Sequence, residues 1–189
     1  MRNTLLIVTA LAALGCSRET THSADSANRA ASEPAAATAD TQPPRHHAEL
    51  APTQGNRASG RIELIPTDGL LTLTGSISGL EPNSEHGFHI HENGDCSAPD
   101  ASSAGGHFNP TSKAHGKPGS ASHHAGDIPN LTADAQGTAQ VNAQLEGVTA
   151  GGGPTSLLGK AIVVHAKADD YKSQPAGNSG ARIACGVIQ

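Results

Sequence analysis

The sequence predicts an all-β domain, an antiparallel sandwich or barrel with Greek-key connections. Short runs of alternating apolar and polar residues, typical of half-buried strands, recur beyond residue 48. The chain also holds 22 glycines and 12 prolines but no Trp, one Tyr and two Phe, a composition that favours turns and short strands. No stretch shows a convincing helical period. A length of 189 residues suits one such domain with appendages.

The first sixteen residues have the pattern of an export signal. Arg2 precedes an apolar run over residues 5–14, which is too short to span a bilayer. The run ends in ALGC at residues 13–16, which resembles a bacterial lipobox, although the lipobox prefers Leu where this chain has Ala13. We therefore expect an exported protein, periplasmic or at the cell envelope, lipid-anchored through Cys16. The alternative is that ordinary signal peptidase removes Cys16 with the signal.

Residues 17–47 are rich in Ala, Ser, Thr, Pro and Asp and show no apolar period. Such a segment cannot bury enough surface to offset the entropy of ordering, so we expect a disordered linker. His46 and His47 close this segment as a pair. A flexible pair of histidines could pick up copper or zinc and pass it on; the alternative is two solvated histidines.

Residues 48–189 form the predicted domain. Alternation is clearest over residues 71–79, where Leu71, Leu73 and Ile77 share one face and Thr and Ser occupy the other. Shorter runs repeat the pattern at residues 62–64, 141–145 and 162–164. Between Asn93 and Leu131 lies a stretch dense in Gly, Ser, Pro and His, without alternation. A loop of this length inside a compact domain is either functional or disordered.

The histidines of the domain indicate a metal site. In the strand predicted over residues 85–91, His89 and His91 share the side opposite to Phe88 and Ile90. Further candidates follow in the loop and on a later strand: His107, His115, His124, Asp127 and His165. A nitrogen-rich set with no thiolate beside it suits copper or zinc, whereas calcium and magnesium prefer oxygen.

Two other histidines are not expected to be ligands. His86 has the opposite parity to His89 and His91 in the predicted strand, so we interpret it as a buried hydrogen-bonding residue. His123 is adjacent to His124, and the spacing favours His124, which stands three residues before Asp127.

Four segments of the domain resemble the copper/zinc superoxide dismutase family. They read GFHIHENGDC at 87–96, GHFNP at 106–110, HAGD at 124–127 and GARIACGV at 180–187. The resemblance covers about residues 50–189. It implies an eight-stranded antiparallel Greek-key barrel or sandwich with long metal-binding and electrostatic loops. It also implies an enzyme that converts superoxide to oxygen and hydrogen peroxide by alternating reduction and oxidation of copper.

The resemblance assigns the metal ligands by position. Copper would be held by His89, His91, His107 and His165. Zinc would be held by His107, His115, His124 and Asp127, so that His107 bonds both metals through its two ring nitrogens. Copper can change oxidation state there, whereas zinc with four ligands is structural and has no accessible redox couple.

The resemblance also assigns roles around the metals. Arg182 would hold the anionic substrate by charge-assisted hydrogen bonds, and His107 would give a proton to the peroxide. Asp169 would link a copper ligand to a zinc ligand and orient both. Cys96 and Cys185 would form a disulfide, which an exported protein can keep oxidised; two free cysteines are the alternative. The segment 171–178 differs from the longer loop of many eukaryotic relatives and leaves the steering geometry open.

The net charge of the chain limits the partners that the sequence predicts. The formal net charge is −5, and residues 1–47 carry four basic and four acidic groups, so the whole net charge belongs to the domain. With no cluster of Lys and Arg, a nucleic-acid partner is not expected. Because a negative domain repels superoxide, attraction must be local, at Arg182. Membrane contact is expected only through the lipid, and a homodimer is compatible with the sequence, which does not select a surface.

Two other functions are the alternatives to the dismutase. One is a non-catalytic exported copper- and zinc-binding protein on the same fold, which the loss of a copper ligand or of Arg182 would favour; each of these positions is filled. The other is a zinc hydrolase, which is disfavoured because the predicted zinc set is already four-coordinate.

Overall fold

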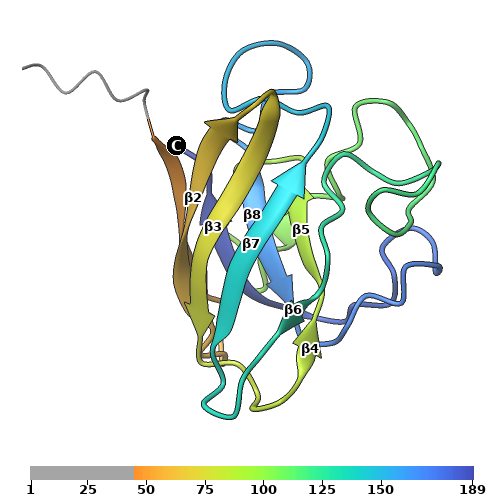
Figure 1. The fold of residues 1–189 in the computed structure, drawn as a ribbon. Coiled ribbons are helices and arrows are strands. Elements are labelled where there is room, and N and C mark those ends of the chain that lie inside the picture. Colours follow the sequence, from red (N-terminus) through yellow and green to blue (C-terminus); the bar gives the residue numbers. More distant parts are fainter. Residues whose placement is uncertain (1–44) are drawn as a thin grey trace, which may run out of the picture. The chain divides into compact units, whose positions relative to one another are not determined.

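A computed structural model describes residues 45–189 of the chain (Figure 1). The predicted export signal, the candidate lipidation site Cys16 and the predicted linker up to residue 44 lie outside the described residues. The elements are β1 (His46–Pro52), β2 (Ser59–Thr67), β3 (Leu70–Ser78), β4 (Glu85–His86), β5 (Phe88–His91), the 3-10 helix η1 (Ser102–Ala104), β6 (Leu131–Thr132), β7 (Ala139–Leu145), β8 (Ala161–His165) and β9 (Arg182–Val187).

The strands form a curled antiparallel sheet. Seven of them are paired in the order β5-β8-β9-β1-β2-β3-β7, and β4 pairs with β6. Strand β6 lies against β7, so the small β4–β6 ladder bridges the two ends of the large sheet (Figure 1). Gly87 alone separates β4 from β5, and if these two are counted as one interrupted strand, the described residues hold eight strands. The all-β, eight-stranded prediction is confirmed.

Alternation along the strands builds the core. In β3, Leu71, Leu73 and Ile77 are buried, while Thr72 and Thr74 are only partly so. The other strands contribute inward residues at every second position in the same way: Ile62, Leu64, Phe88, Ile90, Val141, Leu145, Ile162 and Val164. Burial of these side chains supplies the main stabilising free energy of the barrel, about 25 cal/mol for each Å² of apolar surface removed from water.

The predicted end of the linker was wrong by two residues. Strand β1 begins at His46, with His46 opposite Leu64 and His47 opposite Glu63. The backbone of His47 also exchanges hydrogen bonds of 2.9 Å with that of Gln189. These bonds are made by the main chain, so the polar composition of the segment does not predict them. Consecutive residues of a strand point to opposite faces, so the rings of His46 and His47 do not point toward a common metal site.

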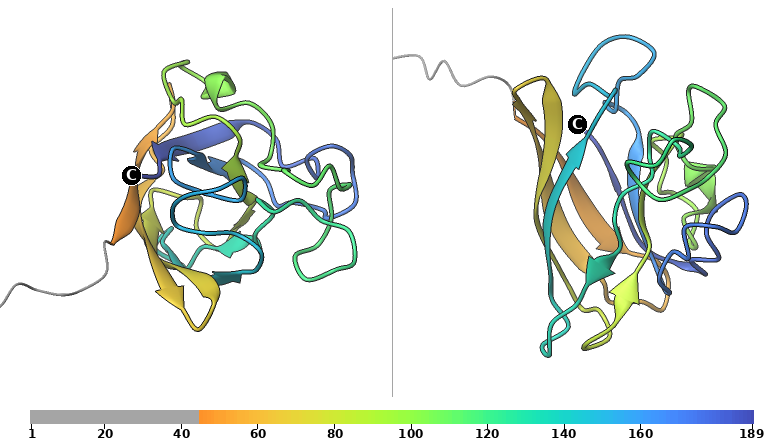
Figure 2. Two further views of the ribbon diagram at one scale, coloured as in Figure 1. Left: turned by 90° about the horizontal axis from the view of Figure 1, so that it is seen from above. Right: turned by 45° about the vertical axis from the view of Figure 1, so that its right-hand side comes forward.

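Two long loops extend from the same side of the barrel. We call residues 92–130, between β5 and β6, the metal loop, and residues 166–181, between β8 and β9, the C-terminal loop. Figures 1 and 2 show them side by side, next to β5 and β8. Among residues 45–189 the one helix is the three-residue η1, and no helix is long and apolar enough to cross a membrane.

Candidate metal centre

Strand pairing brings the first histidines together. In β5, Phe88 and Ile90 point into the core, so His89 and His91 point to the other face of the strand, where they are still buried. Strand β8 pairs with β5 and ends at His165 after a register shift. His107, in the metal loop, forms an isolated bridge with His91. The predicted ligands of one metal therefore come from two neighbouring strands and one loop.

We call His89, His91, His107 and His165 the first cluster. One ring nitrogen from each lies within 4.8 Å of those of the others, and all four residues are buried. The Nε2 atoms of His91 and His165 are 3.3 Å apart. The buried Nδ1 of His89 and Nε2 of His107 have no hydrogen-bond partner among the described residues. Buried polar atoms are nearly always paired, so these nitrogens fit a metal ion.

The remaining ring nitrogens of the first cluster are fixed by hydrogen bonds. His91 Nδ1 donates to Gly105 O at 2.9 Å, and His165 Nδ1 donates to Gly180 O at 3.2 Å. His89 Nε2 donates to Asp169 Oδ2 at 2.7 Å. These bonds select the tautomer of each ring and aim its free nitrogen at the centre of the cluster.

We call His107, His115, His124 and Asp127 the second cluster. Asp127 Oδ1 lies 2.8, 3.1 and 3.3 Å from the Nδ1 atoms of the three histidines, in that order. The Nδ1 atoms of His107 and His124 are 3.4 Å apart. Neighbouring ligands of a tetrahedral zinc with bonds of about 2.0–2.1 Å are roughly 3.3 Å apart, so this set fits zinc.

Backbone groups orient the carboxylate of Asp127. Its Oδ2 accepts the N–H of His124 at 2.8 Å and the N–H of Gly116 at 3.2 Å, which leaves Oδ1 for the cluster. His107 belongs to both clusters, because its Nδ1 faces Asp127 while its Nε2 faces the first cluster. Its two nitrogens are therefore placed to bond two metals at once.

Burial keeps the rings of His89, His91 and His165 neutral, and hydrogen bonds keep the carboxylate of Asp127 ionised. Burial lowers the pKa of His89 to about 4 and that of His165 to about 3, and it holds the pKa of His91 well below its usual value. Burial alone would raise the pKa of Asp127, but hydrogen bonds from the His107 ring and the His124 N–H outweigh it and the pKa lies below its ordinary value. At neutral pH the nitrogen lone pairs are free for metals.

The metal-free protein is expected to lose stability as the pH falls from about 6.5 to about 3. In this window His89 and His165 bind protons more readily in the unfolded chain, because their pKa values are about 4 and about 3 in the fold, against an ordinary 6.5. The free energy of unfolding should fall by about 1.4 kcal/mol per pH unit for each ring, down to pH about 4 for His89 and about 3 for His165. Denaturant titrations of the metal-free chain at several pH values measure this, and a flat profile would contradict it.

Arg182 lies beside the first cluster. One terminal nitrogen of its guanidinium donates to Ala101 O at 2.6 Å and the other to Gly105 O at 2.5 Å, so the carbonyl of Gly105 serves both Arg182 and His91. Its positive charge contributes to the low pKa values of His91 and His165. Burial lowers the pKa of Arg182, yet a guanidinium stays charged in proteins. The group retains further N–H donors for an anion.

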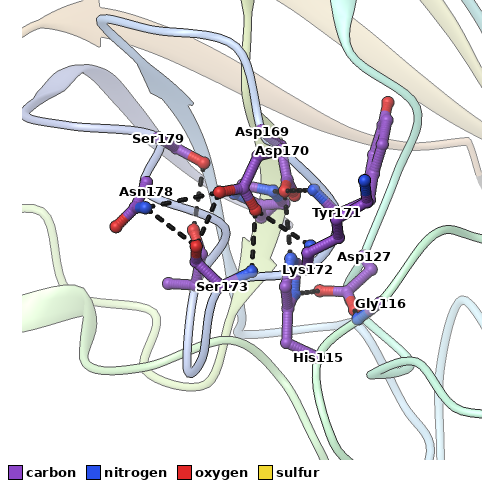
Figure 3. Close-up of polar contacts among 12 residues, drawn as sticks. His115, Gly116, Asp127, Asp169, Asp170, Tyr171, Lys172, Ser173, Asn178 and Ser179 are labelled. Atoms are coloured by element: carbon purple, nitrogen blue, oxygen red, sulfur yellow. Dashed lines mark hydrogen bonds and ion pairs between the residues drawn. The ribbon is translucent and has the colours of Figure 1, made fainter.

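Asp169 joins the two clusters, as the resemblance implies. Its Oδ2 accepts from His89 Nε2 at 2.7 Å. Its Oδ1 accepts from His115 Nε2 at 3.0 Å, and Figure 3 shows Asp169 beside His115. Burial alone would raise the pKa of Asp169, but the hydrogen bond from His89 and others outweigh it, so the pKa is lowered. The carboxylate therefore stays ionised between the two rings and orients both.

The other two histidines near the ligands stay outside both clusters. His86 is buried, with Nδ1 donating to His165 O at 2.8 Å and Nε2 bonded to Ser84 Oγ at 2.7 Å. The interpretation of His86 as a buried hydrogen-bonding residue is confirmed. His123 bonds the carbonyl of His124 through Nδ1 at 2.8 Å.

The predicted disulfide is present. Cys96 and Cys185 are joined with a Cα–Cα distance of 5.8 Å, which ties the start of the metal loop to β9. Arg182 stands in the same strand, three residues before Cys185. The bridge therefore holds together the parts of the chain that carry Arg182 and its acceptors Ala101 and Gly105.

Comparison with known proteins shows what the chain is similar to. A family model described as copper/zinc superoxide dismutase matches residues 58–188. Superoxide dismutase [Cu-Zn] 2 of Aquifex aeolicus is 46% identical over 147 residues, covering 76% of this chain and 85% of the relative. The superoxide dismutase-like protein YojM of Bacillus subtilis is 40% identical over 189 residues, covering 97% of this chain and 93% of the relative.

Solved structures share the fold. A double mutant of a superoxide dismutase-like protein from Bacillus subtilis superposes with a TM-score of 0.67 at 43% identity, covering 75% of this chain and 95% of that chain. The clock protein EA4 gives a TM-score of 0.69 at 39% identity, covering 78% of this chain and 95% of that chain.

Proposed function

Because this chain belongs to the copper/zinc superoxide dismutase family, we propose that it is an active dismutase, with copper in the first cluster and zinc in the second. The observation that carries the proposal is the first cluster itself, where four buried imidazoles converge beside the cation of Arg182. Relatives with dismutase names and with dismutase-like names both occur, so activity must be argued from these residues.

The first cluster would hold copper through Nδ1 of His89 and Nε2 of His91, His107 and His165. Bound there, copper supplies the change between two oxidation states that dismutation of superoxide requires. Arg182 binds and orients the anion with the N–H groups that its two backbone acceptors leave over. When it is not bonded to copper, His107 Nε2 would hold a proton, which it would give to the peroxide.

The second cluster would hold zinc through three Nδ1 atoms and Oδ1 of Asp127. Zinc has no accessible redox couple, and four protein ligands complete its tetrahedron, so its role is structural. With zinc bound, Nδ1 of His107 would be held in place, and Nε2 would be left to exchange a proton. All four of these residues lie in the metal loop, so the ion would join parts of that loop to one another.

Metal loading tests the function. The full chain loaded with copper and zinc is expected to dismutate superoxide, whereas the chain loaded with zinc alone should not, because zinc cannot accept an electron. Rapid-mixing assays of superoxide decay, with the metal content measured on the same samples, decide this. No activity with both sites filled would instead make the protein a copper- and zinc-binding relative without turnover.

We further propose export and a lipid anchor at Cys16, on the support of the sequence pattern at residues 1–16. In a bacterial host that lipidates exported proteins, Cys16→Ser is expected to move the protein from the membrane fraction to the soluble fraction. The variant Ala13→Leu, which restores the residue that the lipobox prefers, should stay with the membranes. Identical fractionation of the natural chain and the Cys16→Ser variant would rule out the anchor.

A further inference from the structure

The side chain of Gln174, in the C-terminal loop, lies on the backbone of His115 in the metal loop. Its Oε1 accepts the N–H of His115 at 2.9 Å, and its Nε2 donates to the carbonyl of His115 at 2.9 Å. One amide thus satisfies both main-chain polar groups of a residue in the second cluster. Both bonds cross from one loop to the other, because the two residues are 59 positions apart.

Asn130, in the metal loop, binds the backbone of a residue of the C-terminal loop in the same way. It ends the metal loop, and its side chain bonds the backbone N–H of Asp169 at 2.9 Å and the carbonyl of Asp169 at 3.0 Å. The two residues that are clamped in this way are bonded to each other, His115 Nε2 to Asp169 Oδ1, at 3.0 Å. His115 is thus held at its backbone by a side chain of the C-terminal loop, and Asp169 by a side chain of the metal loop.

The segment around Gln174 is held in shape by Asp170. Its carboxylate accepts from the N–H of Lys172 at 2.9 Å, from the N–H of Ser173 at 2.8 Å and from Asn178 Nδ2 at 3.3 Å (Figure 3). These bonds fix the chain on both sides of Gln174. The amide is therefore presented to His115 by a preformed turn, so little conformational entropy is lost in making the two bonds.

Gly177 lets the C-terminal loop lie directly on the bonded pair. A Cβ atom at this position would stand 1.8 Å from Asp169 Oδ1 and 2.8 Å from His115 Nε2. The residue also has φ +65, in the left-handed region that favours glycine. No side chain fits between this backbone and the hydrogen bond that it covers.

We propose that Gln174 is a positioning residue for the second cluster, holding the backbone of His115 so that the ring meets zinc at bonding distance. This inference rests on the proposed function only in that the second cluster binds zinc. Substitution of groups that orient a metal ligand typically costs 10- to 100-fold in metal affinity. We expect a loss of this size when the amide is removed, and a smaller one when only half of it is lost.

Zinc affinity of three variants of the full chain tests the proposal. Gln174→Ala removes both bonds and should raise the Kd for zinc about 10- to 100-fold. Gln174→Glu keeps an acceptor for the N–H of His115 but cannot donate to its carbonyl, so its Kd should lie between those of the natural chain and Gln174→Ala. Lys172→Ala is the matched control, because it changes an exposed side chain of the same turn and leaves the backbone bonds in place.

Zinc is titrated into the metal-free chains against a chromophoric chelator, and cobalt reports the geometry through its tetrahedral absorption bands. The metal-free variants should still be folded at the temperature of the titration, which their thermal unfolding checks, because the loss of two part-buried hydrogen bonds costs less than the stability of a whole domain. A Kd for zinc in Gln174→Ala within twofold of the natural value overturns the inference alone. Failure of the natural chain to bind zinc or cobalt overturns the proposed function, and this inference with it.

A second pair of variants tests the same turn without touching the amide. Gly177→Ala places a methyl group against Asp169 and His115, whereas Gly152→Ala, at φ +80, meets no atom within 4 Å. Both pay the cost of a left-handed alanine, so only the contact differs. Zinc affinity should fall in Gly177→Ala and stay unchanged in Gly152→Ala. Equal affinities would mean that the turn does not position the ligands.

Discussion

Replacement of Arg182 by Ile is expected to lower kcat/KM for superoxide about 10- to 100-fold, with copper and zinc content unchanged. The fold presents the guanidinium beside the first cluster on two carbonyls, of Ala101 and Gly105, which leaves N–H donors for an anion. A hydrogen bond to a charged group contributes about 1.5–3 kcal/mol, which corresponds to this range. Stopped-flow assays at fixed ionic strength measure it.

Arg182→Lys separates charge from geometry. Lys keeps the positive charge but cannot span both carbonyls with a planar fork, so its kcat/KM should lie between those of the natural chain and Arg182→Ile. The variant Lys172→Ala, in the C-terminal loop, controls for the loss of one exposed cation. If kcat/KM is unchanged in Arg182→Ile at full metal content, Arg182 does not bind the substrate.

Loss of the Cys96–Cys185 disulfide is expected to lower the free energy of unfolding of the metal-free protein by about 4–5 kcal/mol. The bridge joins residues 89 positions apart, and the chain-entropy model gives this figure for a loop of that length. The double variant Cys96→Ser/Cys185→Ser, compared with the oxidised natural chain in denaturant titrations, measures the loss. It should also lower the activity, since Ala101 and Gly105 are then held less firmly beneath Arg182.

Reduction of the natural chain is the control for the serine substitutions. If the two serine side chains have no effect of their own, the reduced protein and the double variant should unfold at the same denaturant concentration. A difference from the oxidised protein of less than about 1 kcal/mol would show that the fold does not depend on the covalent link.

Strands were predictable where burial dictates the residue types. Leu71, Leu73 and Ile77 alternate because one face of β3 lines the core, and that pattern is legible without a structure. The start of β1 was not legible, because His46 and His47 are held by main-chain bonds to β2 and Gln189 that any side chain would permit. The break at Gly87 between β4 and β5 could not be predicted either, because the alternation of residue types continues on both sides of it.

The candidate site also has a part that could be predicted from the sequence and a part that could not. The histidines and Asp127 were singled out from their residue types and pattern, and the resemblance to the family divided them between two metals and added Asp169 and Arg182. The atoms that orient them were not predicted, because the carbonyls of Ala101, Gly105 and Gly180 carry no residue-type signal. Gln174 was missed for another reason. A lone glutamine in a loop has no partner that its sequence position reveals, and His115 is reached only through the fold.

The side chains near β5 also affect how well the protein would resist oxidation. The alternation of β5 places His89 and His91 on one face of the strand and the hydrocarbon of Phe88 and Ile90 on the other. Residues 45–189 contain neither Met nor Trp, and their two cysteines are already joined in the disulfide. Hydrogen peroxide is the product of the proposed reaction, and within these described residues it would meet neither a free thiol nor a thioether, the two side-chain groups of the sulfur oxidation ladder.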